Sequence, residues 1–372
     1  MSLPATHPES SHVDVVVVGG GVIGLLTAYE LVEAGAGVTI IDRQRVAKES
    51  SWAGGGILSP LYPWRYPEAV TELASWSQRH YAELIQDLFE TTGVDAQYLE
   101  SGLLIYSPKE QDLAVKWSEK HSILLGIVSP EKASEIQPGI QVDENSWIWM
   151  PKVAQVRNPR LLQALRAYMS IKGVKIIENE PISEIRVKSG KIEGLVANSG
   201  FIPADHCLVA AGAWSAGLLD LSGINLPIEP VRGQILLLKG KPGLVNRIVL
   251  KNSHYLIPRS DGRILVGSTL EYVGFDKATT EQAREELISA AESLVPGITS
   301  ACDIETQWAG LRPGSPEGIP YIGQHPEVSG LFTSSGHFRN GFVLAPASAR
   351  LGTDLILGRE TALDPDTYRL IR

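Results

Sequence analysis

The chain has 372 residues, a length that suggests two or three domains. Of these residues 44% are hydrophobic and 20% are charged, a composition typical of a soluble globular protein. Its formal net charge of −9 disfavours nucleic acid or an anionic membrane as the main partner, because both require basic surface patches. No apolar run is long enough to span a bilayer. The two cysteines have no spacing typical of a disulfide framework, a metal site or a redox motif. The first twelve residues do not resemble a signal peptide, so the expected location is the cytoplasm.

The first apolar segment runs directly into a glycine-rich turn. Residues 15–18 are followed by glycines at G-x-G-x-x-G spacing, by an amphipathic segment, and by a second apolar strand that ends at Asp42. Such a turn lets a pyrophosphate approach the backbone at a helix N-terminus, and a carboxylate at the end of the second strand can bind ribose hydroxyls. The sequence therefore predicts a bound dinucleotide. The contacts predicted at this end are Gly19, Gly21, Val22, Ile23, Gly24, Asp42 and Arg43.

Two unusual segments follow the dinucleotide motif. Residues 50–61 are rich in glycine and small side chains, which indicates either backbone laid along a flat or phosphorylated ligand or a flexible loop. Residues 60–67 are rich in proline and aromatic side chains. That composition is compatible with a lid over a site and with a packed connector, and both interpretations stay open.

The remaining elements follow in chain order. Helices are predicted at 68–92, near 109–121, and at 158–170, where Asn158 is expected to be the N-cap. A hairpin turn is predicted at Ser189-Gly190, and an apolar strand over 207–211 leads into a second glycine turn. Alternating residues over 232–275 predict antiparallel sheet, followed by a helix over 279–294, a strand over 303–311 and a helix over 345–357.

These elements predict a discontinuous nucleotide-binding domain with a substrate domain inserted twice. We expect the first domain to comprise residues 1–65, 150–228 and 312–372, and the second to comprise 66–149 and 229–311.

Four stretches, residues 19–42, 50–58, 210–215 and 311–344, together resemble the flavin-dependent amine oxidases. This family includes D-amino-acid oxidase, sarcosine oxidase and glycine oxidase, and the likeness is greatest to its glycine oxidase branch. The resemblance implies an α/β fold, in which a Rossmann-like FAD-binding domain carries an inserted antiparallel-sheet substrate domain. It also implies FAD rather than NAD. The further FAD contacts that it implies are Ser50, Ser51, Ala53, Gly55, Gly56, Leu58, Gly212, Trp214, His337, Phe338, Arg339, Asn340, Gly341 and Phe342.

Arg312 is the strongest candidate for the substrate anchor. A guanidinium matches a carboxylate with two parallel hydrogen bonds, and Pro313 favours an extended backbone at Arg312. Tyr255 is the second candidate, as a hydroxyl donor to the same carboxylate. A two-residue turn at Asp261-Gly262 would pair Tyr255 with Ser268 and place Leu270 on the same face. The resemblance adds Arg339, whose backbone carbonyl is expected to receive the substrate amine.

Other histidines are not expected to take part. The same register places His254 on the face opposite to Tyr255, while His121 and His325 lie in segments that give no reason to expect more than a surface position.

The resemblance implies oxidative deamination of glycine, and of sarcosine and small D-amino acids. Hydride transfer to flavin N5 would yield the 2-oxo acid (glyoxylate from glycine), ammonia and hydrogen peroxide, in the service of thiamine biosynthesis. Residues 311–316 lack the cysteine through which sarcosine oxidase tethers its flavin, so noncovalent FAD is expected. The resemblance implies oxygen as the electron acceptor. No metal, nucleic acid or membrane is expected. The resemblance also implies a homo-oligomer, a tetramer.

Alternative functions remain within and outside this family. A D-amino-acid oxidase or dehydrogenase, or a sarcosine oxidase, would share the same motifs. A flavin-binding module acting on modified tRNA is disfavoured by the net charge of −9. An aromatic hydroxylase would carry a Gly-Asp dipeptide in its C-terminal part, where this chain has none.

Overall fold

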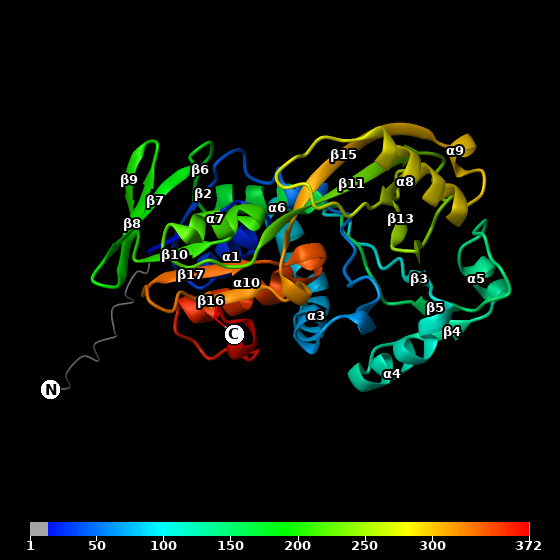
Figure 1. Ribbon diagram of the computed structural model, residues 1–372, viewed down its shortest axis with the longest axis horizontal. Coiled ribbons are helices and arrows are strands. Elements are labelled where there is room, and N and C mark those ends of the chain that lie inside the picture. Colours follow the sequence, from blue (N-terminus) through cyan, green and yellow to red (C-terminus); the bar gives the residue numbers. More distant parts are fainter. Residues whose placement is uncertain (1–13, 372) are drawn as a thin grey trace.

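The computed structural model describes residues 14–371 and contains two large sheets and a small one (Figure 1). The first twelve residues, which were not expected to be a signal peptide, therefore lie outside the described residues. The first sheet has the strand order β16-β17-β10-β1-β2-β6, with all neighbours parallel except β16 and β17. Its strands are β1 (Asp14–Val18), β2 (Gly37–Ile41), β6 (Lys175–Ile177), β10 (His206–Val209), β16 (Tyr321–Gln324) and β17 (Leu331–Ser335).

Both faces of this sheet are covered, because its strands are apolar on both sides. Val15 and Val17 of β1 pack toward one core, while Val16 and Val18 pack toward the other. Helices cover the first face, and a small antiparallel sheet covers the second (Figure 1). The helices are α1 (Val22–Glu33), α3 (Glu68–Thr92), α6 (Asn158–Ile171) and α10 (Gly341–Ile356). The small sheet consists of β7 (Ile182–Lys188), β8 (Lys191–Ala197) and β9 (Gly200–Pro203).

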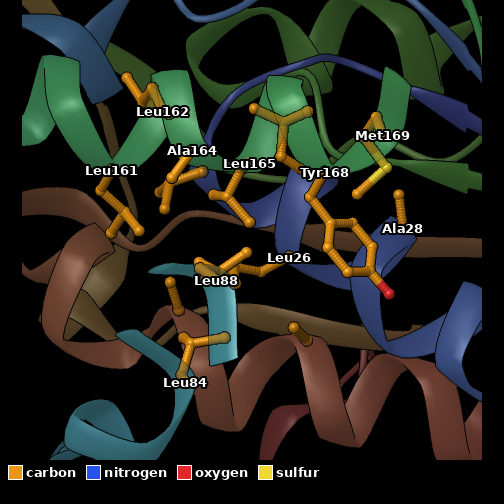
Figure 2. Packing of buried hydrophobic residues seen from close by; sticks show 14 of the residues in the cluster. Leu26, Ala28, Leu84, Leu88, Leu161, Leu162, Ala164, Leu165, Tyr168 and Met169 are labelled. Atoms are coloured by element: carbon orange, nitrogen blue, oxygen red, sulfur yellow. The ribbon is translucent and has the colours of Figure 1, made fainter. Parts of the chain in front are cut away.

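The helical layer is held together by a continuous apolar core. Figure 2 shows Leu84 and Leu88 of α3 gathered with Leu26 of α1 and Leu165 of α6, all of them buried. Helix α3 also contributes to a second cluster with α10. The long helix predicted at 68–92 is confirmed, but it packs with the nucleotide-binding layers. The domain boundary that we predicted at residue 66 does not follow this packing.

The second sheet has eight strands in the order β15-β11-β14-β13-β12-β3-β5-β4. Its pairs are antiparallel, as predicted for residues 232–275, except that β12 and β3 are parallel. The strands are β3 (Leu103–Tyr106), β4 (Gly126–Val128), β5 (Trp147–Met150), β11 (Glu229–Lys239), β12 (Ile248–Lys251), β13 (His254–Pro258), β14 (Arg263–Gly267) and β15 (Asp303–Gly314).

One face of the second sheet packs against helix α8 (Glu281–Leu294), through a core that includes Leu236, Leu256 and Leu287. Residues of the opposite face, among them Ile235, Tyr255 and Ile257, form a separate cluster. The remaining helices are α2 (Ser50–Ala53), α4 (Gln111–His121), α5 (Pro130–Ile136), α7 (Ser215–Asp220) and α9 (Ile298–Ala301).

The role predicted for Asn158 is wrong. Helix α6 includes Asn158 and has Arg157 as its N-cap, without a side-chain cap. The Asn158 side chain instead donates a hydrogen bond to the carbonyl of Ser51, at 2.9 Å. A side chain expected to serve its own helix therefore connects α6 to the glycine-rich segment that begins at residue 50.

Residues 60–67 form a packed connector. Tyr62 is buried and its ring is covered by the guanidinium of Arg65, at 3.8 Å from the ring centroid. Arg65 and Trp64 both donate hydrogen bonds to Glu110, which precedes α4. These contacts attach the segment to α4 and support the second of the two interpretations that the sequence left open.

Helix α10 begins at Gly341, four residues earlier than predicted, and contains Pro346. Proline has no N–H, so the carbonyl of Phe342, four residues before it, cannot receive the usual helical hydrogen bond. The hydroxyl of Tyr81 on α3 donates to that carbonyl instead. A tertiary contact thus compensates for the proline, which the sequence pattern had placed near the start of the helix.

We expect Tyr81→Phe to lower the free energy of unfolding by about 1–3 kcal/mol, because it leaves the buried carbonyl of Phe342 without a donor. In a Pro346→Ala background the new backbone N–H can serve that carbonyl, so the same substitution should cost less. Urea unfolding of the four proteins in this cycle measures the difference. Equal costs in both backgrounds would contradict the coupling.

Candidate active site

A cavity of about 780 Å³ is lined by both large sheets. Its lining includes Gly19 and Asp42, which directly follow β1 and β2 of the first sheet, together with Tyr255 of β13 and Arg312 of β15 of the second sheet. The carboxyl ends of parallel strands are the usual position for a dinucleotide in an open α/β sheet.

Glycine is required at two positions of this motif, one in the turn after β1 and one in the first turn of α1. Gly19 has a φ of +109°, and a Cβ there would lie 2.4 Å from the carbonyl oxygen of Ala210. A Cβ on Gly24 would lie 1.9 Å from the carbonyl oxygen of Gly19. Gly24 therefore serves the close packing of α1 on β1 and does not line the cavity.

The N-terminus of α1 fits a phosphate group. Its N-cap residue is Gly21, which provides no side-chain cap, and the first turn contains no acidic residue. A Cβ on Gly21 would have only the Oγ of Ser51 close to it, at 3.1 Å, so this position faces open space. The N–H of Val22 donates to the same Oγ at 2.9 Å. The free N–H groups of the first turn and the helix dipole both favour an anion here.

Asp42 is held rigidly at the end of β2. Its carboxylate accepts hydrogen bonds from the backbone N–H of Gly20, at 2.8 Å, and of Gln44, at 3.0 Å. Burial raises the pKa of Asp42, while these two hydrogen bonds lower it. A carboxylate that lines the cavity in this position fits the ribose contact predicted for it.

The glycine-rich segment 50–56 is held against the second sheet by hydrogen bonds. The Oγ of Ser50 donates to the carbonyl of Leu311 at 2.7 Å, and the indole N–H of Trp308 donates to the carbonyl of Ala53 at 2.9 Å. Arg259 donates to the carbonyl of Gly55 at 2.8 Å. These contacts do not support the interpretation of the segment as a flexible loop. Its backbone forms part of the cavity wall.

Arg312 lies half-buried in the cavity wall, where its guanidinium is fixed by neutral acceptors. It donates to the Oγ of Ser268 at 2.7 Å and to the carbonyls of Thr269 and Arg232 at 3.1 and 3.4 Å. Among residues 14–371 no carboxylate forms an ion pair with it. Burial lowers the pKa of Arg312 to about 10, and the like charge of Arg339 acts in the same direction. The guanidinium thus remains cationic at neutral pH, ready to bind an anion.

Gly233 of β11 makes room for this guanidinium. A Cβ there would lie 2.2 Å from each terminal nitrogen of Arg312 and 2.3 Å from the carbon between them. A glycine in the middle of a strand weakens the strand and often marks such a close approach. The sequence contained the mid-strand glycine, but it could not show that the group approaching Gly233 is the guanidinium of Arg312.

The register predicted for Tyr255 is wrong by one residue. The turn after β13 has three residues, because the N–H of Arg259 bonds the carbonyl of Arg263, and Tyr255 is paired with Gly267 instead of Ser268. A Cβ on Gly267 would lie 2.6 Å from the hydroxyl and ring of Tyr255. Tyr255 is buried and lines the cavity, so its predicted location holds despite the register.

Leu270 does not lie where we predicted. With the hairpin shifted, its side chain is 44% exposed and is absent from the cavity lining, whereas Ser268 lines the cavity. His254 lies away from the cavity as expected, with its Nε2 2.9 Å from a carboxylate oxygen of Glu286 on α8. His325, which we expected at the surface, is buried, and its Nδ1 accepts hydrogen bonds from two backbone N–H groups.

His337 lines the cavity but is not suited to carry charge. Burial lowers its pKa to about 3, so the ring is neutral at physiological pH. Its Nε2 lies 3.0 Å from the Oγ of Ser348 on α10. Two other groups stack on Trp214, which also lines the cavity: the guanidinium carbon of Arg43 lies 3.7 Å from its ring centroid, and the Phe275 ring lies at a centroid distance of 5.4 Å.

Most of the predicted site residues share this one cavity. The cavity is lined by Gly19, Gly21, Val22, Ile23, Asp42, Arg43, Ser50, Ser51, Ala53, Gly55, Gly56, Gly212, Trp214, Tyr255, Arg312, His337, Phe338, Arg339, Gly341 and Phe342. The predicted residues that do not line it are Gly24, Leu58, Leu270 and Asn340. Leu58 is part of the apolar core, and Asn340 is buried.

Several lining residues were not predicted from the sequence, including Gly233 and Phe275 and the segments 180–183 and 228–230. These residues carry no motif, because they reach the cavity only through the pairing of distant strands. Neither Cys207 nor Cys302 lines it, and both are free and buried.

Two kinds of feature are absent from residues 14–371. No group of three or more His, Cys, Asp or Glu side chains within residues 14–371 is arranged to hold a metal ion. None of the helices between those residues is long and apolar enough to cross a membrane.

The two-sheet architecture and the dinucleotide cavity define a nucleotide-cofactor oxidoreductase. The sequence profile of the family described as FAD dependent oxidoreductase (DAO) matches residues 14–355, and the chain belongs to this family. The residues fit FAD, since the α1 N-terminus, Asp42 and the side-chain-poor segment 50–56 all line one continuous cavity.

Several proteins similar to this chain are named glycine oxidase. The chain is 48% identical over 357 residues to a glycine oxidase of Pseudomonas aeruginosa, a match that covers 95% of this chain and 97% of that protein. The crystal structure of a glycine oxidase from Geobacillus kaustophilus matches with a TM-score of 0.92 and 29% identity, covering 96% of this chain and 98% of that one. A bifunctional ThiO/ThiG protein of Synechocystis is 33% identical over 94% of this chain, which spans 52% of that protein.

We expect Gly233→Ala to retain FAD but to raise KM for the amino acid by roughly tenfold or more, because the new methyl group must displace the guanidinium of Arg312, the predicted anchor of the substrate carboxylate. Steady-state kinetics and the visible flavin spectrum measure the two effects. Gly126→Ala in β4 of the same sheet is a matched control, since a Cβ there meets nothing within 4 Å. An unchanged KM in Gly233→Ala would show that Arg312 is not the anchor.

Proposed function

We propose that this protein is an FAD-dependent glycine oxidase: glycine, oxygen and water give glyoxylate, ammonia and hydrogen peroxide. The observation that carries this proposal is the half-buried guanidinium of Arg312, which has no ion-pair partner among the described residues and lies in the same cavity as the dinucleotide motif. The names of the relatives support glycine as the substrate.

When bound, FAD supplies the hydride acceptor, flavin N5. The protein must bind the substrate so that its α-carbon faces that atom and must exclude competing reactions. Arg312 binds the substrate carboxylate through its two-pronged donor face. The hydroxyl of Tyr255 donates to the same carboxylate, and the backbone carbonyl of Arg339 accepts a hydrogen bond from the substrate amine.

The proposed substrate range follows from the small number of substrate groups that the protein contacts. Arg312, Tyr255 and Arg339 hold only the carboxylate and the amine, which are present in glycine, sarcosine and small D-amino acids. A D-amino-acid oxidase or dehydrogenase, or a sarcosine oxidase, is therefore the alternative within this family.

Further parts of the proposal are noncovalent FAD, oxygen as acceptor, a cytoplasmic location and a homotetramer. The position of both cysteines outside the cavity supports noncovalent binding. A role in thiamine biosynthesis is supported by the similarity to a bifunctional ThiO/ThiG protein, of which this chain spans 52%. Size-exclusion chromatography with light scattering measures the subunit number.

The direct test is the visible spectrum of the purified protein before and after anaerobic addition of glycine. Bleaching of the flavin bands, followed by release of glyoxylate and peroxide when oxygen is admitted, is the expected result. Sarcosine, D-alanine and D-proline, each assayed with oxygen and with a dye acceptor, distinguish the alternatives. A flavin that D-proline reduces and glycine does not would refute glycine oxidation.

We expect Arg312→Ala to keep FAD and to lose at least roughly tenfold in kcat/KM for glycine, since each charge-assisted hydrogen bond contributes about 1.5–3 kcal/mol. Arg263→Ala is the control, because Arg263 lies on the same sheet but pairs with Asp261 and Glu305 outside the cavity. Normal kinetics in Arg312→Ala would exclude the proposed anchor.

A further inference from the structure

Arg259, directly after β13, is a buried cation without a counter-ion. Its side chain donates to the Oε1 of Gln155 at 2.6 Å and to the carbonyls of Val156 and Gly55 at 2.9 and 2.8 Å. All three acceptors are neutral, its Nε has no hydrogen-bond partner, and the residue is 7% exposed. No carboxylate within residues 14–371 forms an ion pair with it. Burial lowers the pKa of Arg259 to about 10, so the guanidinium is still charged at neutral pH.

The neighbouring arginines are different in this respect. Arg157 pairs with Asp261 at 2.9 Å, and Arg263 pairs with both Asp261 and Glu305. An isolated buried charge is costly to a folded protein, because neutral acceptors replace its hydration only in part. Strongly perturbed buried groups cluster at functional sites, and the position of Arg259 gives its charge such a context.

That position is the wall of the cavity. Tyr255 and Ile257 of β13 and Arg259, directly after it, alternate along the chain and share one face, and all three lie beside the same residue, Gly55. A Cβ on Gly55 would lie 2.5 Å from the Cδ1 of Ile257 and 3.5 Å from the hydroxyl of Tyr255, while Arg259 holds the Gly55 carbonyl. Gly55 lines the cavity, so the charge of Arg259 is separated from the cavity by one peptide group.

We propose that Arg259 is a positioning residue that orients the Gly55 peptide and supplies positive charge to this wall, so that it raises the reduction potential of bound FAD. The proposal rests on the proposed function in one respect, that FAD binds in this cavity. A hydride carries two electrons and one proton from the substrate carbon, so its transfer adds one negative charge to the acceptor. A nearby cation that is already desolvated stabilises this added charge without reorganisation.

Arg259→Gln tests the charge directly, because glutamine can still donate to the Gly55 carbonyl. We expect the ratio of reduced to oxidised FAD at a fixed potential to fall about tenfold, which for a two-electron couple lowers the midpoint potential by about 30 mV. Arg259→Lys keeps the charge and should stay close to wild type. The midpoint is measured by reduction alongside a reference dye, in the absence of any amino acid.

Arg157→Gln is the matched control, since Arg157 is a neighbouring cation whose charge is paired, and no shift is expected there. A wild-type potential in Arg259→Gln, or an equal shift in the lysine and glutamine variants, would overturn the proposal. Arg259→Met is the second neutral variant if glutamine prevents folding. If no neutral variant folds with FAD, the residue serves folding and the proposal is rejected. A wild-type protein without FAD would instead refute the proposed function.

Discussion

The attachment of segment 50–56 to the second sheet is the constraint on which the rest of the site depends. Three hydrogen bonds join them, between Ser50 and Leu311, Trp308 and Ala53, and Arg259 and Gly55. The segment is poor in side chains, so its own carbonyls and hydroxyls are the groups available for contact. Because Leu311 directly precedes Arg312, the backbone that carries the candidate anchor is bonded to the wall of the nucleotide cavity. The relative position of the two binding regions is thus determined by a few short contacts.

The distribution of charge in this region follows from the same packing. Arg157 and Arg263 have carboxylate partners, whereas the guanidinium groups of Arg259 and Arg312 bond only neutral acceptors. Carboxylates near the site are engaged elsewhere, as Glu271 is with Arg232. The cavity end near Tyr255 therefore has excess positive charge in the protein alone. Such a site favours an anionic substrate and an increase in negative charge during reaction.

Close approaches in this cavity are made possible by glycines on separate strands. Gly233 accommodates the guanidinium of Arg312, and Gly267 accommodates the ring of Tyr255. A Cβ on Gly55 would also lie 3.5 Å from this ring. These three positions come from three different segments, so the shape of the substrate end depends on tertiary pairing as much as on the identity of the polar side chains.

The sequence by itself determined the dinucleotide motif, the long helix at 68–92, the mostly antiparallel second sheet and the candidate anchor Arg312, because each depends on local spacing or on a recognisable motif. The tertiary structure decided what depends on contacts between distant segments. It moved the register of Tyr255 by one residue, because a three-residue turn and a two-residue turn share the same Asp-Gly signal. It placed Leu270 outside the cavity, assigned α3 to the nucleotide-binding layers, and used Tyr81 to satisfy the carbonyl that Pro346 leaves free. Local sequence specifies elements and their faces, whereas only packing specifies which buried polar group meets which partner.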